Sequence, residues 1–541
     1  MISSPPARDC YIDRVDITST LHKRIDAFKR GYRQNVGLVG RRYMGKSSIL
    51  KNLLIHYSCP EIIPVYIALQ PEPFDYFAKK LMGTILQAYL KSSNMVVPSS
   101  FDALVKKVRK YLPRTIQRMR SVKQHMVRNN MTKAYEELFS LTELLHEESG
   151  KKVLLILDEF DRLEEFGIGD PFLSFSHEIM VQKDTMYIVA SSREERAEKI
   201  FREKLSLLFG NFESIAVLPF NFDESSQFIR HCLASATIAP EYIKLLIRVT
   251  DGHPFYLSVI VKELQRCAVS RNNVVTDEVI IDVLTQLLFQ PEGQLQQHIL
   301  LELSSLHKGC QFYVYLNILL AIATGRKKIR TIARFVEKSK EETKKGLQRL
   351  VDGQLIKRSG SLYCVKDAFL RFWLKYVFYR QFVSLGICRG EHEEAFRRDM
   401  FDLIDSSCHE EHKELSKRIE ELLRTFCNDV IEVNKKRIKC PSFSEVYLRP
   451  TNGRIYPVYA KAPNTRWLCQ VADKSVDEED VQTLVAESKK MRKKINRRIL
   501  ITPHGINLNA KLMAKQAKIM IWNLRNLNFV FDLYDKPKVI I

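Results

Sequence analysis

Short, strongly apolar runs alternate with helical patterns in the first part of this 541-residue chain. The runs cover residues 36–39, 62–69, 153–157, 186–190 and 214–218. Runs this apolar are typical of strands buried on both faces, as in a parallel sheet flanked by helices. The pattern therefore predicts an α/β domain over residues 1–222, with a helical insert at about 95–150.

The remaining residues predict four further segments. Residues 223–307 have an almost wholly helical pattern, residues 308–385 combine helices with a hairpin, and residues 386–426 form a long amphipathic connector. Residues 427–541 predict a smaller α/β unit, with strands at 454–461, 466–472, 498–502 and 529–533 and helices at 478–491 and 509–516. A chain of this length exceeds one ordinary core, so several units are expected.

A glycine-bounded loop follows the first predicted strand and precedes a helix. Its residues are Gly40, Arg41, Arg42, Tyr43, Met44, Gly45, Lys46, Ser47 and Ser48, with the spacing GxxxxGKS. The two glycines let successive backbone N–H groups face inward and surround phosphate oxygens, and the dipole of the following helix favours the same anion. Lys46 supplies a positive charge to the β- and γ-phosphates, and Ser47 is a ligand for Mg²⁺. The motif predicts a nucleotide site, which we expect to take ATP with Mg²⁺.

Two further strand ends carry polar side chains that fit the same chemistry. The strand at 153–157 ends in Asp158 and Glu159, where Asp158 is suited to the Mg²⁺ shell and Glu159 to orienting or deprotonating the attacking water. The strand at 186–190 is followed by Ser191 and Ser192. Ser192 is a candidate for sensing the γ-phosphate, although a helix cap by either serine explains the same residues.

Taken together, these motifs resemble the archaeal-type ATPases of the STAND/AAA+ group of P-loop proteins. The resemblance rests on Asp13-Arg14, the glycine loop, Leu157-Asp158-Glu159-Phe160-Asp161 and Gly252-His253-Pro254, and it covers roughly residues 10–385. It implies a sheet order of 5-1-4-3-2, a helical lid over residues 223–307, and His253 and Pro254 near the adenine. The family often has Gly-Arg after the sensor helix, where this chain has Gly210-Asn211, which favours a slow switch over vigorous turnover.

Residues 311–365 predict a winged helix that binds DNA. Helices at 317–324 and 331–338 precede a third that opens with a Ser339–Glu342 capping box and ends at Asp352-Gly353, and a hairpin at 355–365 follows. The candidate DNA contacts are Lys340, Lys344, Lys345 and Arg349 on the third helix and Lys357 and Arg358 on the wing. The alternative is a winged helix that packs against protein, since the same apolar positions serve both uses.

A basic run lies in the insert between the second and third strands. From Lys106 to Lys133 there are Lys and Arg residues and no Asp or Glu. Solvated helix faces usually mix the two signs of charge, so this run favours phosphate binding over an ordinary solvent-exposed face.

The C-terminal unit resembles the PD-(D/E)xK nuclease-like domain that is fused to such ATPases. A nuclease site of that kind needs an Asp followed by Glu-x-Lys on the next strand, because Mg²⁺ binds carboxylates. Here the Glu-x-Lys position has Gln470-Val471-Ala472, and no Asp or Glu occurs from Val446 to Ala472. We therefore expect a degenerate domain without nuclease activity, in which Lys461 and Arg466 can still attract phosphate.

Composition narrows the partner and the compartment. The net charge of +22 indicates a polyanionic partner, most often nucleic acid. Anionic lipid would explain the same charge equally well, and so would a requirement for solubility. The 11 cysteines form no CxxC pair, which disfavours zinc and suits a reducing cytosol. With neither a signal-peptide pattern nor a membrane-length apolar stretch, the sequence predicts a cytoplasmic protein. The overall expectation is an ATP-driven switch that binds DNA; the alternative is a signalling or scaffold ATPase whose partner is another protein or a second copy.

Overall fold

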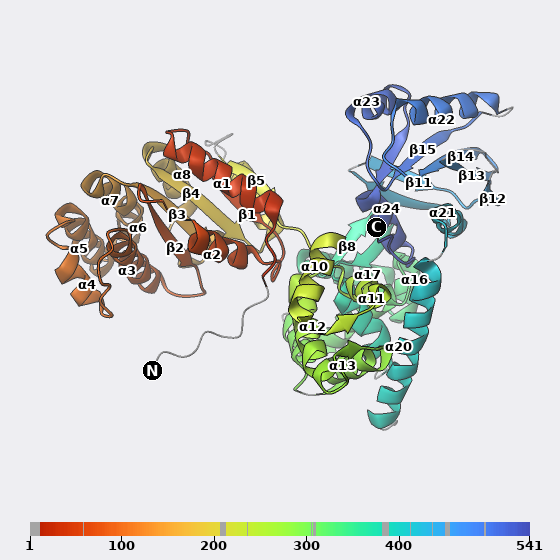
Figure 1. The fold of residues 1–541 in the computed structure, drawn as a ribbon, viewed down its shortest axis with the longest axis horizontal. Helices are drawn as coiled ribbons and strands as arrows, with labels where there is room; N and C mark the ends of the chain where they lie inside the picture. Colours follow the sequence, from red (N-terminus) through yellow and green to blue (C-terminus); the bar gives the residue numbers. More distant parts are fainter. Residues whose placement is uncertain are drawn as a thin grey trace. The chain divides into compact units, whose positions relative to one another are not determined.

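The computed structural model describes residues 11–57, 59–205, 212–234, 236–290, 292–304, 306, 310–380, 389–411, 413–434, 436–448, 455–491 and 494–540. The chain divides into two compact units. Unit 1 comprises residues 1–220 with His253–Phe255, and unit 2 comprises residues 221–252 and 256–541. Figure 1 shows the helices and strands of both units.

Unit 1 is built on a five-stranded parallel sheet. Its strands are β1 (Asn35–Val39), β2 (Ile62–Ala68), β3 (Lys152–Asp158), β4 (Thr185–Ser191) and β5 (Phe212–Ala216). They lie in the order β5-β1-β4-β3-β2. All five apolar runs thus form strands, and the central ones are buried throughout because helices cover both faces.

Alternate residues of each strand face different helices. Leu154 and Ile156 of β3 pack in the cluster that includes α1 (Val15–Lys29) and α2 (Lys46–His56). Val153, Leu155 and Leu157 pack in the cluster with α3 (Phe74–Ser92) and α8 (Pro171–Val181). This division follows from the two-residue repeat of a strand, which sends successive side chains to opposite faces.

The predicted insert consists of four helices between α3 and β3. They are α4 (Phe101–Val108), α5 (Pro113–Val127), α6 (Met131–Phe139) and α7 (Leu141–Ser149). In Figure 1 these helices lie beyond the β2 edge of the sheet. Their apolar residues, among them Ile116, Met119 and Leu138, join the same core as α3, so the insert is an integral part of unit 1.

Unit 2 begins with helices, as its sequence pattern predicts. These are α10 (Phe222–Leu233), α11 (Pro240–Thr250), α12 (Pro254–Val269), α13 (Asp277–Phe289) and α14 (Gln294–Leu303). Two short strands, β6 (Thr237–Ile238) and β7 (Val274–Val275), pair in parallel between them. Three helices and an antiparallel hairpin then follow: α15 (Cys310–Ala323), α16 (Ile329–Phe335), α17 (Lys340–Asp352), β8 (Ile356–Ser359) and β9 (Leu362–Val365).

The C-terminal part of unit 2 is a mixed sheet joined to the preceding helices. Helices α18 (Ala368–Trp373), α20 (Arg389–Glu411) and α21 (Leu415–Arg424) lead to the antiparallel pair β10 (Asp429–Val433) and β11 (Lys436–Cys440). The five-stranded sheet has the order β12-β13-β14-β15-β16. Its strands are β12 (Glu445–Leu448), β13 (Ile455–Ala462), β14 (Thr465–Ala472), β15 (Arg497–Thr502) and β16 (Met520–Asn523), and α22 (Glu478–Lys490), α23 (Leu508–Gln516) and α24 (Leu524–Leu533) complete the unit.

One predicted strand is wrong. Residues 529–533 belong to helix α24, not to a strand, and the last strand is β16, which precedes it. The Asn523 side chain caps this helix by accepting the N–H of Asn526, and Leu527, Val530 and Phe531 are buried on one face. A five-residue apolar run does not distinguish a strand from a buried helix. In this case the Asn523 cap is the feature that marks the segment as a helix.

None of the helices within the described ranges combines the length and apolar character that a bilayer crossing requires.

Candidate nucleotide site

The glycine loop runs from the end of β1 to the start of α2 in unit 1. Gly45 has a φ of 88° and forms the N-cap of α2, a backbone conformation that favours glycine. At Gly40 the backbone passes close to the Val217 carbonyl, so any side chain at this position would collide with it. Both glycines of the motif are thus required by geometry, and the loop leads directly into a helix N-terminus that favours an anion.

The Lys46 side chain folds back into the loop. Its ammonium group donates hydrogen bonds to the carbonyl oxygens of Gly40 (2.7 Å) and Arg41 (2.8 Å) and to the hydroxyl oxygen of Ser192 (2.9 Å). Burial lowers the pKa of Lys46, while the nearby carboxylates of Glu159 and Asp158 act in the opposite direction. A buried ammonium held only by neutral oxygens is suited to exchange them for phosphate oxygens.

Asp158, at the carboxyl end of β3, lies against Ser47. The Ser47 hydroxyl donates to Asp158 Oδ2 at 2.5 Å, and the Tyr66 hydroxyl donates to the same oxygen at 3.0 Å. Asp158 Oδ1 is buried and has no hydrogen-bond partner among the described residues. Mg²⁺ prefers hard oxygen ligands, and the Ser47 hydroxyl and the Asp158 carboxylate, with its unpaired Oδ1, are ligands of this kind. These two residues therefore fit the expected cation.

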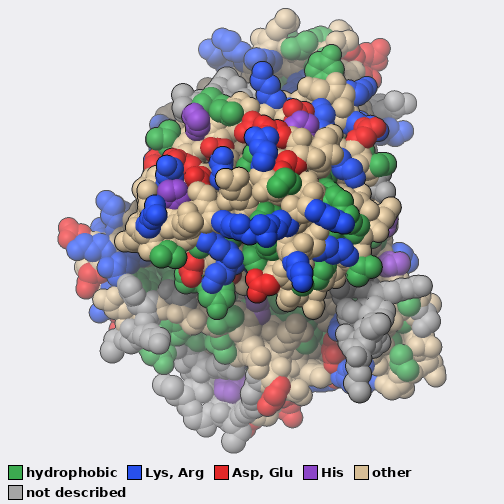
Figure 2. Space-filling view, turned by 90° about the vertical axis from the view of Figure 1, so that its left-hand side faces the viewer, with side chains coloured by type: hydrophobic (Ala, Val, Ile, Leu, Met, Phe, Trp, Pro, Cys, Tyr) green, Lys and Arg blue, Asp and Glu red, His purple; other side chains and the backbone are tan. Residues whose placement is uncertain are grey.

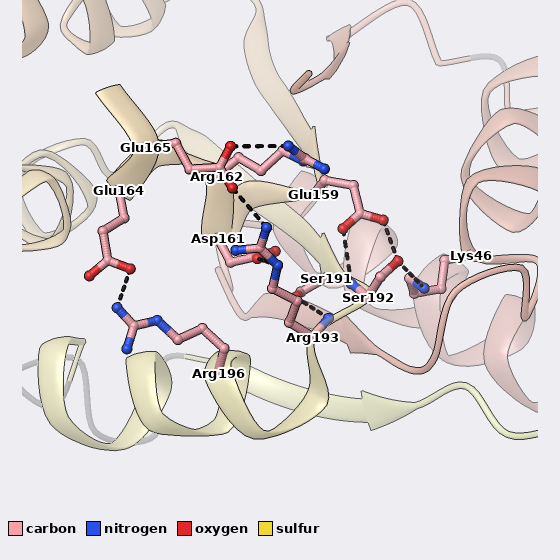
Figure 3. A network of polar contacts seen from close by, with 10 residues as sticks. All are labelled: Lys46, Glu159, Asp161, Arg162, Glu164, Glu165, Ser191, Ser192, Arg193 and Arg196. Atoms are coloured by element: carbon pink, nitrogen blue, oxygen red, sulfur yellow. Dashed lines mark hydrogen bonds and ion pairs between the residues drawn. The ribbon is translucent and has the colours of Figure 1, made fainter. Parts of the chain in front are cut away.

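Glu159 is held by the end of the neighbouring strand β4. The Ser192 backbone N–H donates to Glu159 Oε2 at 3.0 Å, and the Ser192 hydroxyl donates to Glu159 Oε1 (Figure 3). Glu159 has a φ of 56°, a left-handed conformation that is uncommon for a residue other than glycine. Ser192 therefore links Glu159 to Lys46.

A second polar network fixes the segment beyond Ser192. Arg193 contacts the buried Asp161 at 3.5 Å and Glu165 at 2.8 Å, and Arg196 pairs with Glu164 (Figure 3). Asp161 and both glutamates come from the short helix at Phe160–Phe166, directly after Glu159. These ion pairs tie the ends of β3 and β4 together.

Residues outside the motif border the loop. Arg14 is buried, donates to the carbonyls of Leu218 and Met44, and stacks on Phe220 at 4.6 Å. The Tyr43 ring contacts the Phe255 ring, with centroids 4.9 Å apart. His253–Phe255 groups with unit 1, although Pro254 and Phe255 are the first residues of helix α12.

Most of this site was predictable from the sequence, and part of it was not. The structure brings Lys46, Ser47, Asp158, Glu159 and Ser192 together. Of the other loop residues, Arg42 and Ser48 are exposed, Tyr43 is half exposed, and Met44 is buried in the core. Tyr66 and Phe255 were not among the predicted residues. A tyrosine near the end of an otherwise apolar strand was the only signal for Tyr66. Asn211 lies outside the described residues.

The proposed DNA-contacting residues divide between an open helix and a covered hairpin. Lys340, Lys344 and Lys345 of α17 are exposed, and none has an ion-pair partner among the described residues. Arg349 is exposed but donates to the Tyr315 hydroxyl (2.5 Å) and to Gln311 (3.2 Å).

The hairpin packs on the C-terminal part of unit 2. Lys357 is half-buried, 4.0 Å from Asp532 and 4.6 Å from the centre of the Phe529 ring. Arg358 is exposed, although it bends back to the Gly360 carbonyl at 3.0 Å. The turn bonds to β10, where the Ser361 N–H donates to the Val430 carbonyl at 2.8 Å. The hairpin thus meets protein, while the face of α17 remains open.

The C-terminal sheet carries no carboxylate at the expected nuclease position. Gln470 is buried in β14, and its Oε1 has no hydrogen-bond partner among the described residues. Lys461 pairs with Glu445 at 2.5 Å, and Asp473 is exposed beyond the end of the strand. Across the described residues, no group of three or more His, Cys, Asp or Glu is arranged to hold a metal ion.

In unit 1, a glycine loop joins the first strand of a parallel sheet to a helix and lies beside the acidic end of β3, which is the arrangement that a P-loop motif predicts. No family description and no curated protein matches the chain.

Solved structures with related folds are known. The Walker-type ATPase PABY2304 of Pyrococcus abyssi is 20% identical, with a TM-score of 0.46, over 69% of this chain and 99% of its own. The Aeropyrum pernix ORC2 protein in its ADPNP–ADP complexes is 12% identical, with a TM-score of 0.41, over 75% of this chain and 96% of its own. The ORC1 protein of the same organism in complex with DNA is 14% identical, with a TM-score of 0.36, over 72% and 93%.

Proposed function

We propose that the protein binds ATP and hydrolyses it slowly, and that its nucleotide state controls how unit 2 engages DNA. The observation that supports ATP binding most directly is the convergence of Lys46, Ser47, Asp158, Glu159 and Ser192 at the carboxyl ends of β1, β3 and β4. In open parallel sheets, ligands bind at this edge.

Each of these residues has a role in the proposed reaction. The N–H groups of the loop and the Lys46 ammonium hold the β- and γ-phosphates. Ser47 and Asp158 would hold Mg²⁺, which neutralises charge that develops on the phosphate oxygens. Glu159 orients a water molecule and accepts its proton while the water oxygen attacks the γ-phosphorus and the bond to the ADP oxygen breaks.

Turnover is slow in this proposal for a structural reason. Glu159 is hydrogen-bonded to both the backbone N–H and the hydroxyl of Ser192. These bonds hold the carboxylate at Ser192, and turning it toward the γ-phosphate would break them. Ser192 can release it when its hydroxyl turns to a phosphate oxygen.

The ATP site is tested by two substitutions with matched controls. Lys46→Ala should weaken ATP binding by about 10- to 100-fold, because it removes a charge-assisted hydrogen bond to phosphate. Glu159→Gln should preserve binding and lower kcat by about 10²- to 10⁴-fold, because the amide cannot accept the proton. Lys51→Ala and Glu198→Gln change exposed residues of the same unit and should leave both quantities unchanged. Equal ATP affinity in wild type and Lys46→Ala would refute the site.

The DNA part of the proposal rests on α17 as the recognition helix of a winged helix. Its Ser339–Glu342 capping box is formed, and Lys340, Lys344 and Lys345 extend from the exposed face. A recognition helix inserts such a face into the major groove. Because the hairpin is packed on β10, the helix must act without a free wing. A protein partner on the same face remains the competing proposal, and nuclease activity is not part of either.

DNA binding through α17 predicts a salt-dependent affinity. Lys344→Ala with Lys345→Ala should weaken binding of duplex DNA and flatten the slope of log K against log salt by about 0.9 for each phosphate that the helix no longer neutralises. The exposed lysines Lys511 and Lys515 of α23 provide a control pair in the same unit. If the double variant binds every duplex as the wild type does, the protein-partner proposal replaces this one.

A further inference from the structure

The insert of unit 1 presents a face that is rich in Lys and Arg side chains. Figure 2 views the molecule from the side that carries α4, α5 and α7 and shows Lys and Arg side chains gathered in a band across it. Ten cations lie between the end of α4 and the start of α6: Lys106, Lys107, Arg109, Lys110, Arg114, Arg118, Arg120, Lys123, Arg128 and Lys133. Seven of them are exposed, and Lys107, Arg118 and Lys123 are half-buried.

These cations lack the carboxylate partners that cations have elsewhere in unit 1. Among the described residues, Arg114 alone of the ten forms an ion pair, with Glu147 at 2.7 Å. By contrast, Arg24 pairs with Glu213, Arg193 with Glu165, and Lys204 with Asp170. The charge of the insert is therefore directed outward without neutralisation.

Two acidic residues of the insert are used for internal structure. Glu148 accepts the backbone N–H groups of Arg114 (2.7 Å) and Thr115 (2.9 Å) and so caps the start of α5. Glu137 lies 3.5 Å from His125. These two carboxylates hold the helices together. Asp102, Glu136 and Glu147 are exposed elsewhere on the insert, so the cations outnumber the exposed acidic residues there.

Four of the cations surround a single hollow. Lys106, Lys107, Arg109 and Lys110 line an open depression of about 630 Å³ at the end of α4. Lys107 donates to the Val96 carbonyl at 2.7 Å, which holds it in place at the rim. Like charges gathered this closely repel one another, and a polyanion that binds them relieves the repulsion.

We propose that this face binds the sugar–phosphate backbone of nucleic acid without reading its sequence. Lys and Arg contact phosphates, and Arg does so with two parallel N–H groups. The site lies on unit 1, so it is separate from α17 and does not rest on it.

An anionic membrane is the main competing occupant, and the arrangement of apolar residues disfavours it. A helix that lies in a bilayer surface needs a contiguous exposed apolar stripe beside its cations. On α4 and α5 the apolar side chains that form such a stripe, Leu104, Val108, Ile116, Met119 and Val122, are all buried in the core of unit 1. Val96, Tyr111 and Val127 are exposed, but Val96 and Tyr111 lie outside α4 and α5 and Val127 is the last residue of α5, so they do not form an apolar stripe along either helix.

The experiment measures binding of the full-length protein to a fluorescent 30-base-pair duplex of mixed sequence by anisotropy, over a series of salt concentrations. The test variant carries Lys106→Gln, Arg109→Gln, Lys110→Gln and Arg120→Gln. The control carries Lys23→Gln, Arg30→Gln, Lys51→Gln and Lys183→Gln, four exposed residues of the same unit, so both proteins lose the same charge. Thermal unfolding and ATP binding verify that both variants are folded.

We expect the test variant to lose at least about 100-fold in affinity near 0.1 M salt. The slope of log K against log salt should become shallower by about 0.9 for each phosphate contact that is lost, which is a decrease of about 3.6 if all four cations contact phosphates. The control should change little. If the test and control variants lose the same affinity for the duplex, the loss is due to net charge alone and the proposal is overturned. So would a test variant that binds the duplex normally but no longer binds vesicles containing phosphatidylserine.

The outcomes separate this site from α17. A loss confined to the insert variant would establish the insert face and refute the α17 part of the proposed function. A loss confined to the Lys344 and Lys345 variant would do the reverse. The absence of any nucleic-acid binding at about 50 mM salt would overturn both, while the ATP site would still be decided by its own substitutions.

Discussion

At the scale of single residues, the most strongly perturbed carboxylate of unit 2 is Asp532. Burial alone would raise its pKa, but the adjacent guanidinium of Arg371, with Lys538 and Lys357, lowers the pKa well below the usual range. Arg371 and Asp532 form a direct ion pair, and both are largely buried. The pair joins α18 to α24, so a single carboxylate contributes to holding the C-terminal helix in place.

Asp532→Asn should destabilise unit 2 by about 3–5 kcal/mol at neutral pH, because Arg371 would be left as a buried charge without its counterion. Since the folded pKa of Asp532 is depressed, its contribution is fully present above the unfolded pKa of about 4 and is lost as the pH falls below it. The wild-type free energy of unfolding should therefore fall more steeply below pH 4, by up to about 1.4 kcal/mol per pH unit.

Urea unfolding followed by tryptophan fluorescence measures this effect in unit 2, because Trp373, Trp467 and Trp522, the three tryptophans of the chain, all belong to it. Asp405→Asn, at a position with 79% of its side chain exposed, is the control. Parallel acid-dependence curves for wild type and Asp532→Asn would contradict the assignment.

At the scale of elements, the β8–β9 hairpin and the strand β10 form one packed structure. The side chain of Ser359 accepts the N–H of Glu432 at 2.9 Å, and that of Ser361 accepts the N–H of Val430 at 3.0 Å. Gly360 at the turn has a φ of 59°, and a Cβ there would lie far inside van der Waals contact of the Val430 carbonyl. The hairpin thus approaches β10 more closely than any residue with a side chain would permit.

Gly360→Ala should destabilise unit 2 by about 2–4 kcal/mol, the sum of a left-handed alanine and an overpacked contact. Gly505→Ala separates the two causes, because Gly505 has a φ of 96° and no atom within 4 Å of an added Cβ. That control should cost only the backbone strain, about 1–2 kcal/mol. If the two variants unfold at the same urea concentration, the close approach to β10 contributes nothing.

Helices and strands were predictable from the sequence where the hydrophobic pattern agreed with residues that mark the ends of an element. The strand before Gly40 and the helix between Ser339 and Asp352 were found because a glycine loop and a capping box mark their ends. The helix over Leu524–Leu533 was missed for two reasons. An apolar run of five residues fits the two-residue repeat of a strand as well as the 3.6-residue repeat of a helix, and the Asn523 cap was not recognised. A Cβ on Gly346 of α17 would come within 2.7 Å of Ile318, so the glycine permits close packing of this helix against α15.

At the scale of the whole molecule, the residues of the candidate nucleotide site that belong to motifs could be predicted from the sequence, and those brought in by folding could not. Lys46, Ser47, Asp158 and Glu159 are each marked by their neighbours in the chain. Tyr66 reaches Asp158 only because β2 and β3 are adjacent in the sheet, with Ala68 opposite Asp158. Such contacts depend on strand order, which no local pattern contains.

The shared packing of the hairpin and the C-terminal sheet has a consequence for how this protein could have changed over time. Leu362 and Cys364 of β9 belong to the same apolar cluster as Ile431, Trp467 and Trp522. Removing residues 427–541 would therefore expose the side of the hairpin that packs against them, together with part of the apolar core that the two segments share. Selection for folding alone would therefore be sufficient to retain this segment, whether or not it performs any chemistry.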